Sequence, residues 1–244
     1  MNKNLQRALI LTAGALVAAG VGVVIGRASV LSPTTSTSTS TTSSTSTTTG
    51  STSTTSLVVQ PDTAVYPFAS TSVRFVTPTG AARAFATDFL RFTDPVIGEF
   101  QSGDSQSGEV NISNRDGGAV TTVLVRKFGS PSTWWVLGSA TANIAVSTPT
   151  ALSTISSPVR LTGTSTAFEA VVNVSLYRDG SLVPVQSGIV MGGSMGMMGS
   201  FSSNFTFPGA LTGRGTLVLH TLSAKDGSVV EASTVRVVFS SSGN

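Results

Sequence analysis

Residues 215–239 read GTLVLHTLSAKDGSVVEASTVRVVF, with an apolar run on either side of an Asp-Gly pair. An Asp-Gly pair between runs rich in β-branched and aromatic residues is the strongest short-range sign of a β-hairpin. The same pattern surrounds Asp179-Gly180 in residues 167–190, AFEAVVNVSLYRDGSLVPVQSGIV. From residue 143 onward the sequence predicts short strands only, near 143–147, 157–162, 167–178, 182–190, 200–206, 215–224 and 229–239. About seven strands at roughly ten-residue spacing predict an immunoglobulin-like β-sandwich over residues 143–240.

The preceding residues, 57–142, predict a small α+β module. In residues 79–92, TGAARAFATDFLRF, apolar side chains recur at the three- and four-residue spacing of one helical face. Thr77 or Thr79 can cap this helix. Three strands are expected after it, at 108–113, 119–128 and 133–142, with Asp116-Gly117 as the turn between the first two.

The net charge of the chain belongs to its N-terminal part. The formal net charge is +3, and only 10% of the residues are charged. Residues 1–56 contain three basic residues and no acidic one, so residues 57–244 carry eleven basic and eleven acidic residues. A region without net charge has no long-range field to attract a polyanion. We therefore expect no nucleic-acid partner.

The sequence has no cysteine and a single histidine, His220. Disulfides, thiolate zinc sites, cysteine nucleophiles and multi-histidine metal centres are therefore excluded. His220 stands in an apolar run, and no nucleophile motif such as G-x-S-x-G accompanies it. We expect a partly buried structural histidine, no catalytic residue, no metal and no cofactor, and hence a protein that is not an enzyme.

Residues 8–26, ALILTAGALVAAGVGVVIG, form a run of nineteen uncharged residues. As a helix this run is about 28 Å long, close to the thickness of a bilayer core. Lys3 and Arg7 precede it, so the positive-inside rule predicts that residues 1–7 lie in the cytoplasm and the rest outside. We expect an uncleaved signal anchor, with a cleaved signal peptide as the alternative. Three small residues have the spacing of a helix-dimer face, although composition alone accounts for them: Gly14, Ala18 and Gly22.

Residues 27–56 predict a disordered, Ser/Thr-rich stalk. From residue 32 to residue 56, every residue except Pro33 and Gly50 is Ser or Thr. Such a segment cannot bury apolar surface, so it cannot repay the entropy lost on ordering. Ser/Thr-rich tracts beside a membrane serve as spacers or as glycosylated stalks. A stalk is useful where the folded part stands away from the bilayer, which favours a single-pass membrane protein with its C-terminal region outside the cell.

Several motifs between residues 155 and 239 follow one another in the order of a bacterial domain family. They are ISSPVRLTG at 155–163, AFEA at 167–170, VSLYRDG at 174–180, GSF at 199–201, FTF at 205–207 and STVRVVF at 233–239. Over residues 143–240 the chain resembles the Gmad-type immunoglobulin-like domain of bacterial spore-germination and envelope proteins. The resemblance implies an extracytoplasmic binding or structural module without catalytic residues. The sequence contains no GerM domain, the neighbour of this domain in germination proteins, so a germination role does not follow.

Residues 191–199, MGGSMGMMG, contain four of the five methionines, namely Met191, Met195, Met197 and Met198. Methionine is flexible and polarizable, and it makes adaptable contact surfaces. We interpret the segment as a mobile loop between strands, with partner contact as the functional alternative. Thioethers also bind Cu(I), but no histidine or cysteine lies nearby in the sequence.

Trp134 and Trp135 are adjacent in a predicted strand, so their rings must point to opposite faces. One ring is expected in the core and the other exposed or at a domain junction. An exposed Trp is the best single candidate for a binding hot spot. Phe168 and Glu169 are likewise expected to alternate across a strand.

The leading hypothesis is a non-enzymatic, membrane-anchored cell-envelope protein that presents a binding or structural module to an envelope protein or a wall polymer. One alternative is a homo-oligomeric filament or layer, since sandwiches have unpaired strand edges and low charge offers little repulsion. Another is an envelope hydrolase that cleaves wall polymer with two carboxylates, from among the acids Asp88, Asp94, Glu99, Asp104 and Glu109 of the first module. The predicted fold class is mainly β: an N-terminal transmembrane helix, a Ser/Thr-rich linker, a small α+β module and a C-terminal immunoglobulin-like sandwich.

Overall fold

The computed structural model describes residues 61–240. The predicted cytoplasmic residues 1–7, membrane span 8–26 and stalk 27–56 lie outside the described residues. Among residues 61–240, no helix is both long enough and apolar enough to cross a membrane. All the described residues belong to one compact unit.

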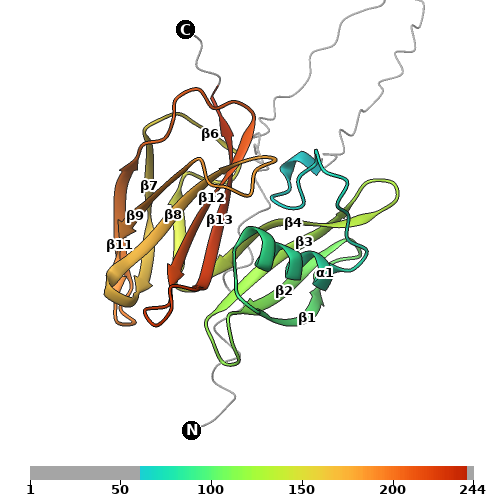
Figure 1. Cartoon of the computed structure of the whole chain (residues 1–244), viewed down its shortest axis with the longest axis horizontal. Helices are drawn as coiled ribbons and strands as arrows, with labels where there is room; N and C mark the ends of the chain where they lie inside the picture. The colour runs from blue at the N-terminus through green and yellow to red at the C-terminus, as the bar shows by residue number, and fades with distance from the viewer. Residues whose placement is uncertain (1–60, 241–244) are drawn as a thin grey trace, which may run out of the picture. The chain divides into compact units, whose positions relative to one another are not determined.

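Two β-sheets, one of eight strands and one of five, account for most of the described chain (Figure 1). The larger sheet has the order β1-β2-β3-β4-β5-β7-β10, with β11 also paired to β7. Its strands are β1 (Val96–Ser102), β2 (Ser107–Ser113), β3 (Val120–Phe128), β4 (Thr133–Thr141), β5 (Ile144–Thr148), β7 (Val159–Ala167), β10 (Gly193–Ser194) and β11 (Gly199–Phe205). The smaller sheet has the order β6-β13-β12-β8-β9, with β6 (Ser153–Ile155), β8 (Val171–Arg178), β9 (Gln186–Met191), β12 (Arg214–Leu222) and β13 (Val229–Phe239).

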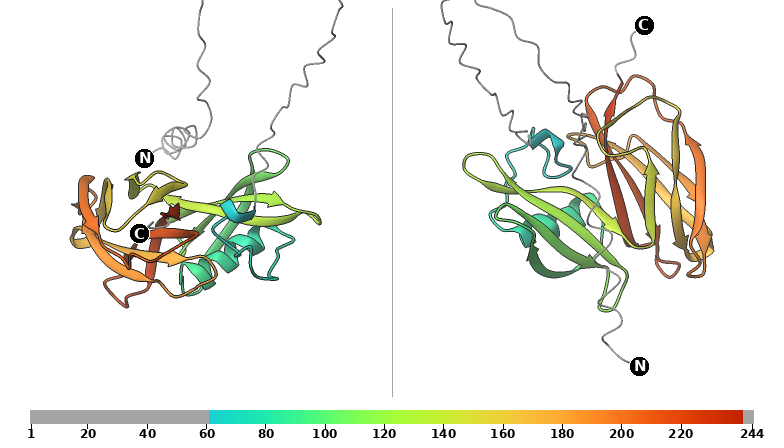
Figure 2. Two further views of the ribbon diagram at one scale, coloured as in Figure 1. Left: turned by 90° about the horizontal axis from the view of Figure 1, so that it is seen from above. Right: turned by 180° about the vertical axis from the view of Figure 1, so that it is seen from behind.

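Strands β5 to β13 build an immunoglobulin-like sandwich, as predicted (Figure 2). Its two sheets enclose an apolar core to which β5 to β9 and β11 to β13 contribute buried residues, at alternate positions in β8 and β12. In β12, Leu217 and Leu219 point into this core, whereas Val218 belongs to a second core on the opposite face of the sheet. The smaller sheet is therefore covered on both faces. This explains why β12 is apolar at consecutive positions rather than at every second one.

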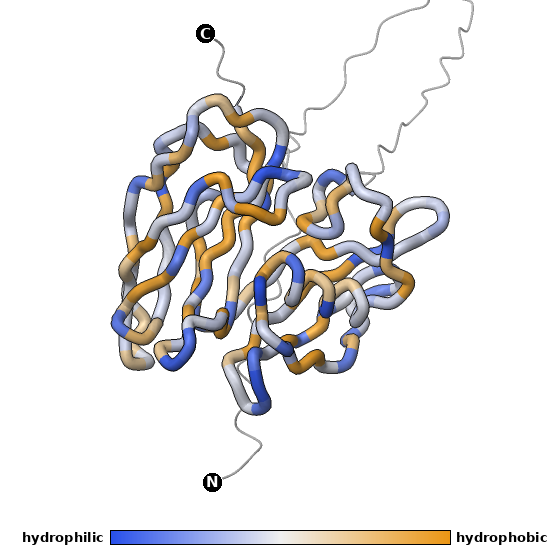
Figure 3. The backbone as a smooth tube through the Cα atoms, viewed as in Figure 1, coloured by the Kyte–Doolittle hydropathy of each residue, from blue (hydrophilic) through white to orange (hydrophobic). Residues whose placement is uncertain are grey.

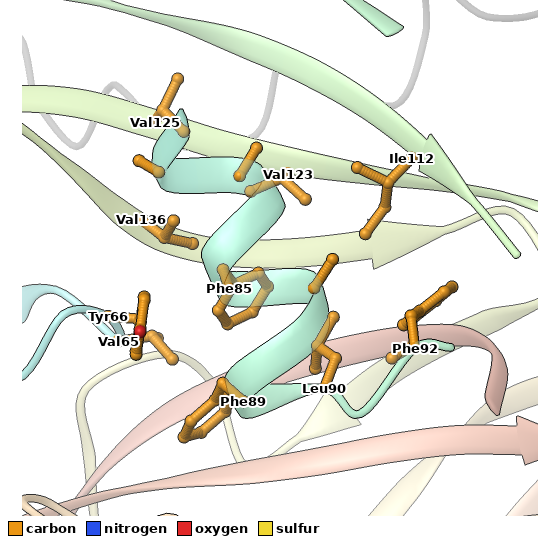
Figure 4. Packing of buried hydrophobic residues seen from close by; sticks show 14 of the residues in the cluster. Val65, Tyr66, Phe85, Phe89, Leu90, Phe92, Ile112, Val123, Val125 and Val136 are labelled. Atoms are coloured by element: carbon orange, nitrogen blue, oxygen red, sulfur yellow. The ribbon is translucent and has the colours of Figure 1, made fainter. Parts of the chain in front are cut away.

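The second core lies under the helix that the sequence predicted (Figure 4). Helix α1 (Pro78–Ala84) continues into a π-helical turn, η2 (Phe85–Phe89). Thr77 caps it, because its hydroxyl accepts the Gly80 N–H at 3.1 Å. The helical conformation ends earlier than the predicted residue 92, since Arg91 has a φ of 66°. Phe85 and Phe89 stack with ring centroids 5.4 Å apart, and the Phe89 ring also contacts Tyr177 of β8 in the smaller sheet, with ring centroids 4.9 Å apart.

The helix core is shared with the sandwich. It contains residues of β2, β3 and β4. It also contains four residues of the smaller sheet, namely Tyr177, Val218, Val229 and Ala232. The larger sheet is also continuous, because β5 pairs with β4 on one side and with β7 on the other. Figure 3 shows hydrophobic stretches along the strands in both parts. Residues 61–142 and 143–240 are thus joined by a common sheet and a common core.

The three Asp-Gly turns are confirmed. Gly117, Gly180 and Gly227 have φ values of 67°, 82° and 73°, which glycine adopts without a steric penalty. The strands before and after each turn pair with each other, as β2 with β3, β8 with β9, and β12 with β13.

Two sequence expectations about strands are corrected. Phe168 and Glu169 do not alternate across a strand, because residues Phe168–Ala170 form a 3-10 turn between β7 and β8. Glu169 and Ala170 have φ values of 57° and 62°, which a strand cannot contain. In addition, β1, β6 and β10 were absent from the sequence prediction. Two of these are very short, and β1 is largely exposed, so its apolar pattern is weak.

Candidate binding cleft

A cleft of about 950 Å³ opens where the turn between β12 and β13 meets the β2–β3 hairpin. Segments far apart in the sequence converge on it, including the end of β7, the 3-10 turn and the β10–β11 turn. Its lining consists of Thr93, Asn114, Arg115, Ala119, Asn143, Thr166, Ala167, Phe168, Met195, Gly196, Thr221, Leu222, Ser223, Ala224, Lys225, Asp226, Ser228, Val230 and Glu231.

The cleft lies at one end of β12, and the described chain begins near the other end. Asp62 forms an ion pair with Arg214, the first residue of β12, and its carbonyl accepts the Arg236 guanidinium at 2.7 Å. Leu222, the last residue of β12, lines the cleft. Eight residue steps at roughly 3.3 Å each separate these ends by about 26 Å. Figure 1 shows residues 61–63 and the β12–β13 turn at opposite ends of these strands.

Glu231 forms part of the cleft lining, although only 4% of its surface is exposed. Its Oε2 accepts the Thr141 hydroxyl at 2.5 Å and the Asn143 amide at 3.0 Å. Its Oε1 accepts the same amide at 3.2 Å and the Thr221 hydroxyl at 3.3 Å. Four hydrogen bonds use the acceptor sites of a carboxylate. Glu231 therefore ties β13 to the β4–β5 connection and has no acceptor site left for a ligand.

Hydroxyl side chains continue this junction along β13. Among the described strands, only β6 pairs with this edge of β13, at Val237–Phe239, so the backbone of the first half of β13 has no strand partner there. The Ala232 N–H donates to Thr121 Oγ1 at 3.1 Å, and Ser139 Oγ donates to the Ala232 carbonyl at 3.0 Å. Ser233 Oγ donates to the Ile144 carbonyl at 2.7 Å. Small hydroxylated residues therefore satisfy backbone groups that would otherwise be buried without partners.

The charged groups at the cleft rim are unequally engaged. Asp226 accepts the Ser228 N–H at 3.1 Å and its hydroxyl at 2.7 Å, and these bonds hold the pKa of Asp226 below its usual range. Within residues 61–240, the ion pairs are Arg214–Asp62 and Arg236–Asp179. Arg115 and Lys225 take part in neither. The lining therefore contains two cations, Arg115 and Lys225, and two carboxylates, Asp226 and Glu231, and the charge of Lys225 contributes to the lowered pKa of Asp226.

Two apolar side chains project at the rim. Phe168 is 62% exposed and Met195 is 80% exposed, and both line the cleft. Met195 has a φ of 54° in the turn between β10 and β11, where the Met197 N–H donates to the Ser194 carbonyl at 2.8 Å. Of the four methionines predicted as contacts, the structure brings only Met195 into the cleft lining, while Met191, Met197 and Met198 are exposed outside it.

Neither tryptophan is exposed, so of the two alternatives for the second ring, exposure or burial at a junction, the exposed hot spot is contradicted. Trp134 is 6% exposed and Trp135 is 2% exposed, on opposite faces of β4. Phe75 bridges to Trp134, and the Arg74 guanidinium lies 4.7 Å from the Trp135 ring. The segment before α1 therefore packs against β4, and the Phe100 ring of β1 lies 5.1 Å from the Trp134 ring; strand periodicity does not reveal these long-range contacts.

The remaining candidates lie elsewhere. His220 is partly buried, as predicted, and burial lowers its pKa. Asp104 accepts the Gln106 and Ser107 N–H groups at 2.7 Å and 2.6 Å, and its pKa is lowered by these bonds. Neither Glu99, Asp104 nor Glu109 lines the cleft. In the described part of the chain, no three His, Asp or Glu side chains group as a metal site.

Two facing, mainly antiparallel sheets with the strand pairing given above define an immunoglobulin-like β-sandwich. Residues 143–228 match the family Gmad2, the immunoglobulin-like domain of bacterial spore germination. The match begins at the residue where the sequence predicted the sandwich to start, and it extends from β5 to the β12–β13 turn. Comparisons of the chain with curated proteins and with solved structures found no match.

Proposed function

We propose that the chain is a non-enzymatic component of the cell envelope, anchored in the membrane through residues 8–26 and exposing its folded part outside the cell. In this proposal the cleft is the binding site for an envelope partner. Residues 1–7 lie in the cytoplasm, and the Ser/Thr-rich residues 27–56 hold the folded part away from the bilayer.

The position of the cleft is the observation that carries this proposal. The chain enters the folded part next to Arg214, and the cleft lies at the other end of β12. A protein tethered through its N-terminus thus presents the cleft on the side away from the tether. The commitment of Asp226 and Glu231 to structural hydrogen bonds supports binding rather than acid–base chemistry in the cleft.

Single-cysteine labelling tests the proposed topology, since the chain has no cysteine of its own. Met197→Cys places a thiol at an exposed position of the folded part, and Asn4→Cys places one before the apolar run. A membrane-impermeant maleimide applied to intact cells should label Met197→Cys and should label Asn4→Cys only after permeabilisation. Labelling of Asn4→Cys in intact cells, or protection of Met197→Cys, would contradict the topology.

Association of copies is a second candidate function, which the exposed strand edges favour. Among the described residues, β1 pairs only with β2, and β9 pairs only with β8. Ile189 and Met191 are exposed on β9, so this edge combines unpaired backbone with apolar side chains. Light scattering of the full-length protein in detergent should then give an oligomer that Ile189→Lys reduces and the matched Leu152→Lys does not. A monomer for the unmodified protein argues against this function.

A further inference from the structure

We propose that the methionine segment, residues 191–198, is an oxidation site, where a hydroperoxide converts four thioethers to sulfoxides while the fold stays intact. The four residues are Met191, Met195, Met197 and Met198. In each step the sulfur gives an electron pair to one peroxide oxygen, so an S–O bond forms and the O–O bond breaks. The departing oxygen takes the proton and leaves as water or an alcohol, so the sulfur is oxidised and the peroxide is reduced. The inference goes beyond the proposed function and does not depend on it.

The described part of the chain keeps its sulfur out of the core. Residues 61–240 contain no cysteine, and all of their methionines lie in the methionine segment. The three clusters of buried apolar residues consist of aliphatic and aromatic side chains and contain no methionine. Methionine is otherwise a common filler of irregular gaps in cores. Oxidation of sulfur in residues 61–240 therefore removes no core contact.

Every thioether of the methionine segment is accessible to a small oxidant. Each of the four side chains is at least half exposed, and Met195 is the most exposed of them. The susceptibility of a sulfur to oxidation follows its exposure. A peroxide can therefore reach all four sulfurs without any opening of the fold.

The backbone of the methionine segment is held by contacts that do not involve the thioethers. The Gly192 N–H donates to the Ala170 carbonyl at 3.1 Å, and the Met197 N–H donates to the Ser194 carbonyl at 2.8 Å. Strand β10 also pairs with β7. An oxygen atom added to each exposed sulfur leaves these hydrogen bonds in place, so the segment keeps its conformation after oxidation.

Oxidation changes two surfaces of the protein together. A sulfoxide is polar, whereas the thioether from which it forms is apolar. Met195 lies at the rim of the cleft with Phe168, and Met191 lies on the β9 edge with Ile189. The reduced and oxidised proteins therefore share one fold and differ in the polarity of the cleft rim and of the β9 edge.

Peptide mass mapping of the full-length protein in detergent, treated with hydrogen peroxide, tests the inference. Cleavage after Arg178 and Arg214 gives the peptide 179–214, which contains the methionine segment and no other methionine. This peptide should gain one oxygen atom for each of its four methionines. The midpoint of thermal unfolding should change by about 2 °C or less, as for a change confined to the surface. Methionine sulfoxide reductases A and B together should return the peptide to its original mass.

A buried methionine is the matched control. Leu219 is fully buried in the sandwich core, and leucine and methionine have similar volumes. In Leu219→Met, the new sulfur should react about a hundredfold or more slowly than the methionine segment of the same molecule, because the peroxide reaches it only when the chain opens. In urea that unfolds the protein, the two should react at similar rates. Leu217→Met gives the same comparison at a second buried position.

Three results would overturn the inference. In the first, the folded protein gains fewer than four oxygen atoms in peptide 179–214. In the second, oxidation lowers the unfolding midpoint by about 5 °C or more, which would show that the thioethers support the fold. In the third, the sulfurs of Leu219→Met and Leu217→Met react as fast as the methionine segment without urea. The labelling of Met197→Cys and Asn4→Cys decides the proposed topology independently of these results.

Discussion

The Glu231 carboxylate receives four hydrogen bonds from Thr141, Asn143 and Thr221. Alanine at this position leaves three donors without an acceptor and removes the link between β13 and the β4–β5 connection. A hydrogen bond to a charged group contributes about 1.5–3 kcal/mol, and bonds in one network do not add fully. Glu231→Ala should therefore lower the free energy of unfolding by about 3 kcal/mol or more, measured by urea denaturation.

Two further variants separate this role from a general effect of removing a carboxylate. Glu99 is exposed on β1, so Glu99→Ala should change the free energy of unfolding by about 0.5 kcal/mol or less. Glu231→Gln retains one carbonyl acceptor and should be less damaging than Glu231→Ala. Equal stability of Glu231→Ala and Glu99→Ala would show that the network is unimportant.

His220 gives the protein a defined response to pH. Burial lowers its pKa, so the unfolded state takes up a proton before the folded state as pH falls. The free energy of unfolding should therefore be highest above about pH 7 and should decrease below the unfolded pKa of about 6.5, by at most about 1.4 kcal/mol per pH unit. Urea denaturation between pH 8 and about pH 5.5 measures this, above the range in which carboxylates titrate.

The chain contains one histidine, so a single variant tests the assignment. In His220→Gln the free energy of unfolding should be nearly constant over the same pH range. A decline that persists in His220→Gln would assign it to other groups.

At the scale of elements, aromatic rings lie over glycines of neighbouring strands. Phe201 pairs with Gly163 across β11 and β7, and a Cβ on Gly163 would lie 2.1 Å from the Ala145 carbonyl oxygen and 2.5 Å from the Phe201 ring. Gly163→Ala should therefore destabilise the protein by about 1–3 kcal/mol, because the larger sheet must shift to admit one methyl group. Thermal unfolding of the full-length protein measures the loss.

Gly209→Ala is the matched control, since a Cβ there would meet nothing within 4 Å. It should leave the midpoint of thermal unfolding nearly unchanged. If Gly163→Ala is equally harmless, β7 and β11 are not packed as closely as the structure indicates.

The elements that sequence reasoning predicted correctly depend on local chemistry. Asp-Gly turns require positive φ at glycine, and Thr77 followed by Pro78 is a favourable helix start, so both features follow from a few neighbouring residues. The end of the helix and the break at Phe168–Ala170 depend instead on packing against distant strands. Periodicity gives no sign of either, and residues 79–92 and 167–178 were therefore predicted too long.

The candidate cleft is only partly predictable from the sequence, because its residues come together through packing of distant segments. The sequence marks Met195 as a candidate contact because four methionines lie together in residues 191–199. Arg115, Phe168 and Lys225 come from three separate turns that only the tertiary structure brings together. The sequence does distinguish Glu231, because it is the one acidic residue in the largely apolar and hydroxylated run 229–239. Its partners on β4 and β12 could not be identified from one strand.

For the whole molecule, the shared helix core predicts cooperative unfolding. Both tryptophans lie in β4, so their fluorescence reports on residues 61–142, whereas most of the strands seen by circular dichroism belong to the sandwich. Because Tyr177 and Val218 of the sandwich complete the core beneath the helix, the two signals should change at the same urea concentration. Fluorescence and circular dichroism measured on the same samples give the comparison. Two separated transitions would show that the parts unfold independently.

The attachment of Asp62 to Arg214 and Arg236 also determines how the molecule would carry mechanical load. In a protein tethered as proposed, tension between the anchor and a ligand in the cleft runs lengthwise along β12 and β13. Antiparallel hydrogen bonds lie perpendicular to the strands, so such a pull shears many of them at once instead of opening them one after another. The contacts of Asp62 with Arg214 and Arg236 transmit part of the force directly to these two strands, so the segment before the helix bears less of it.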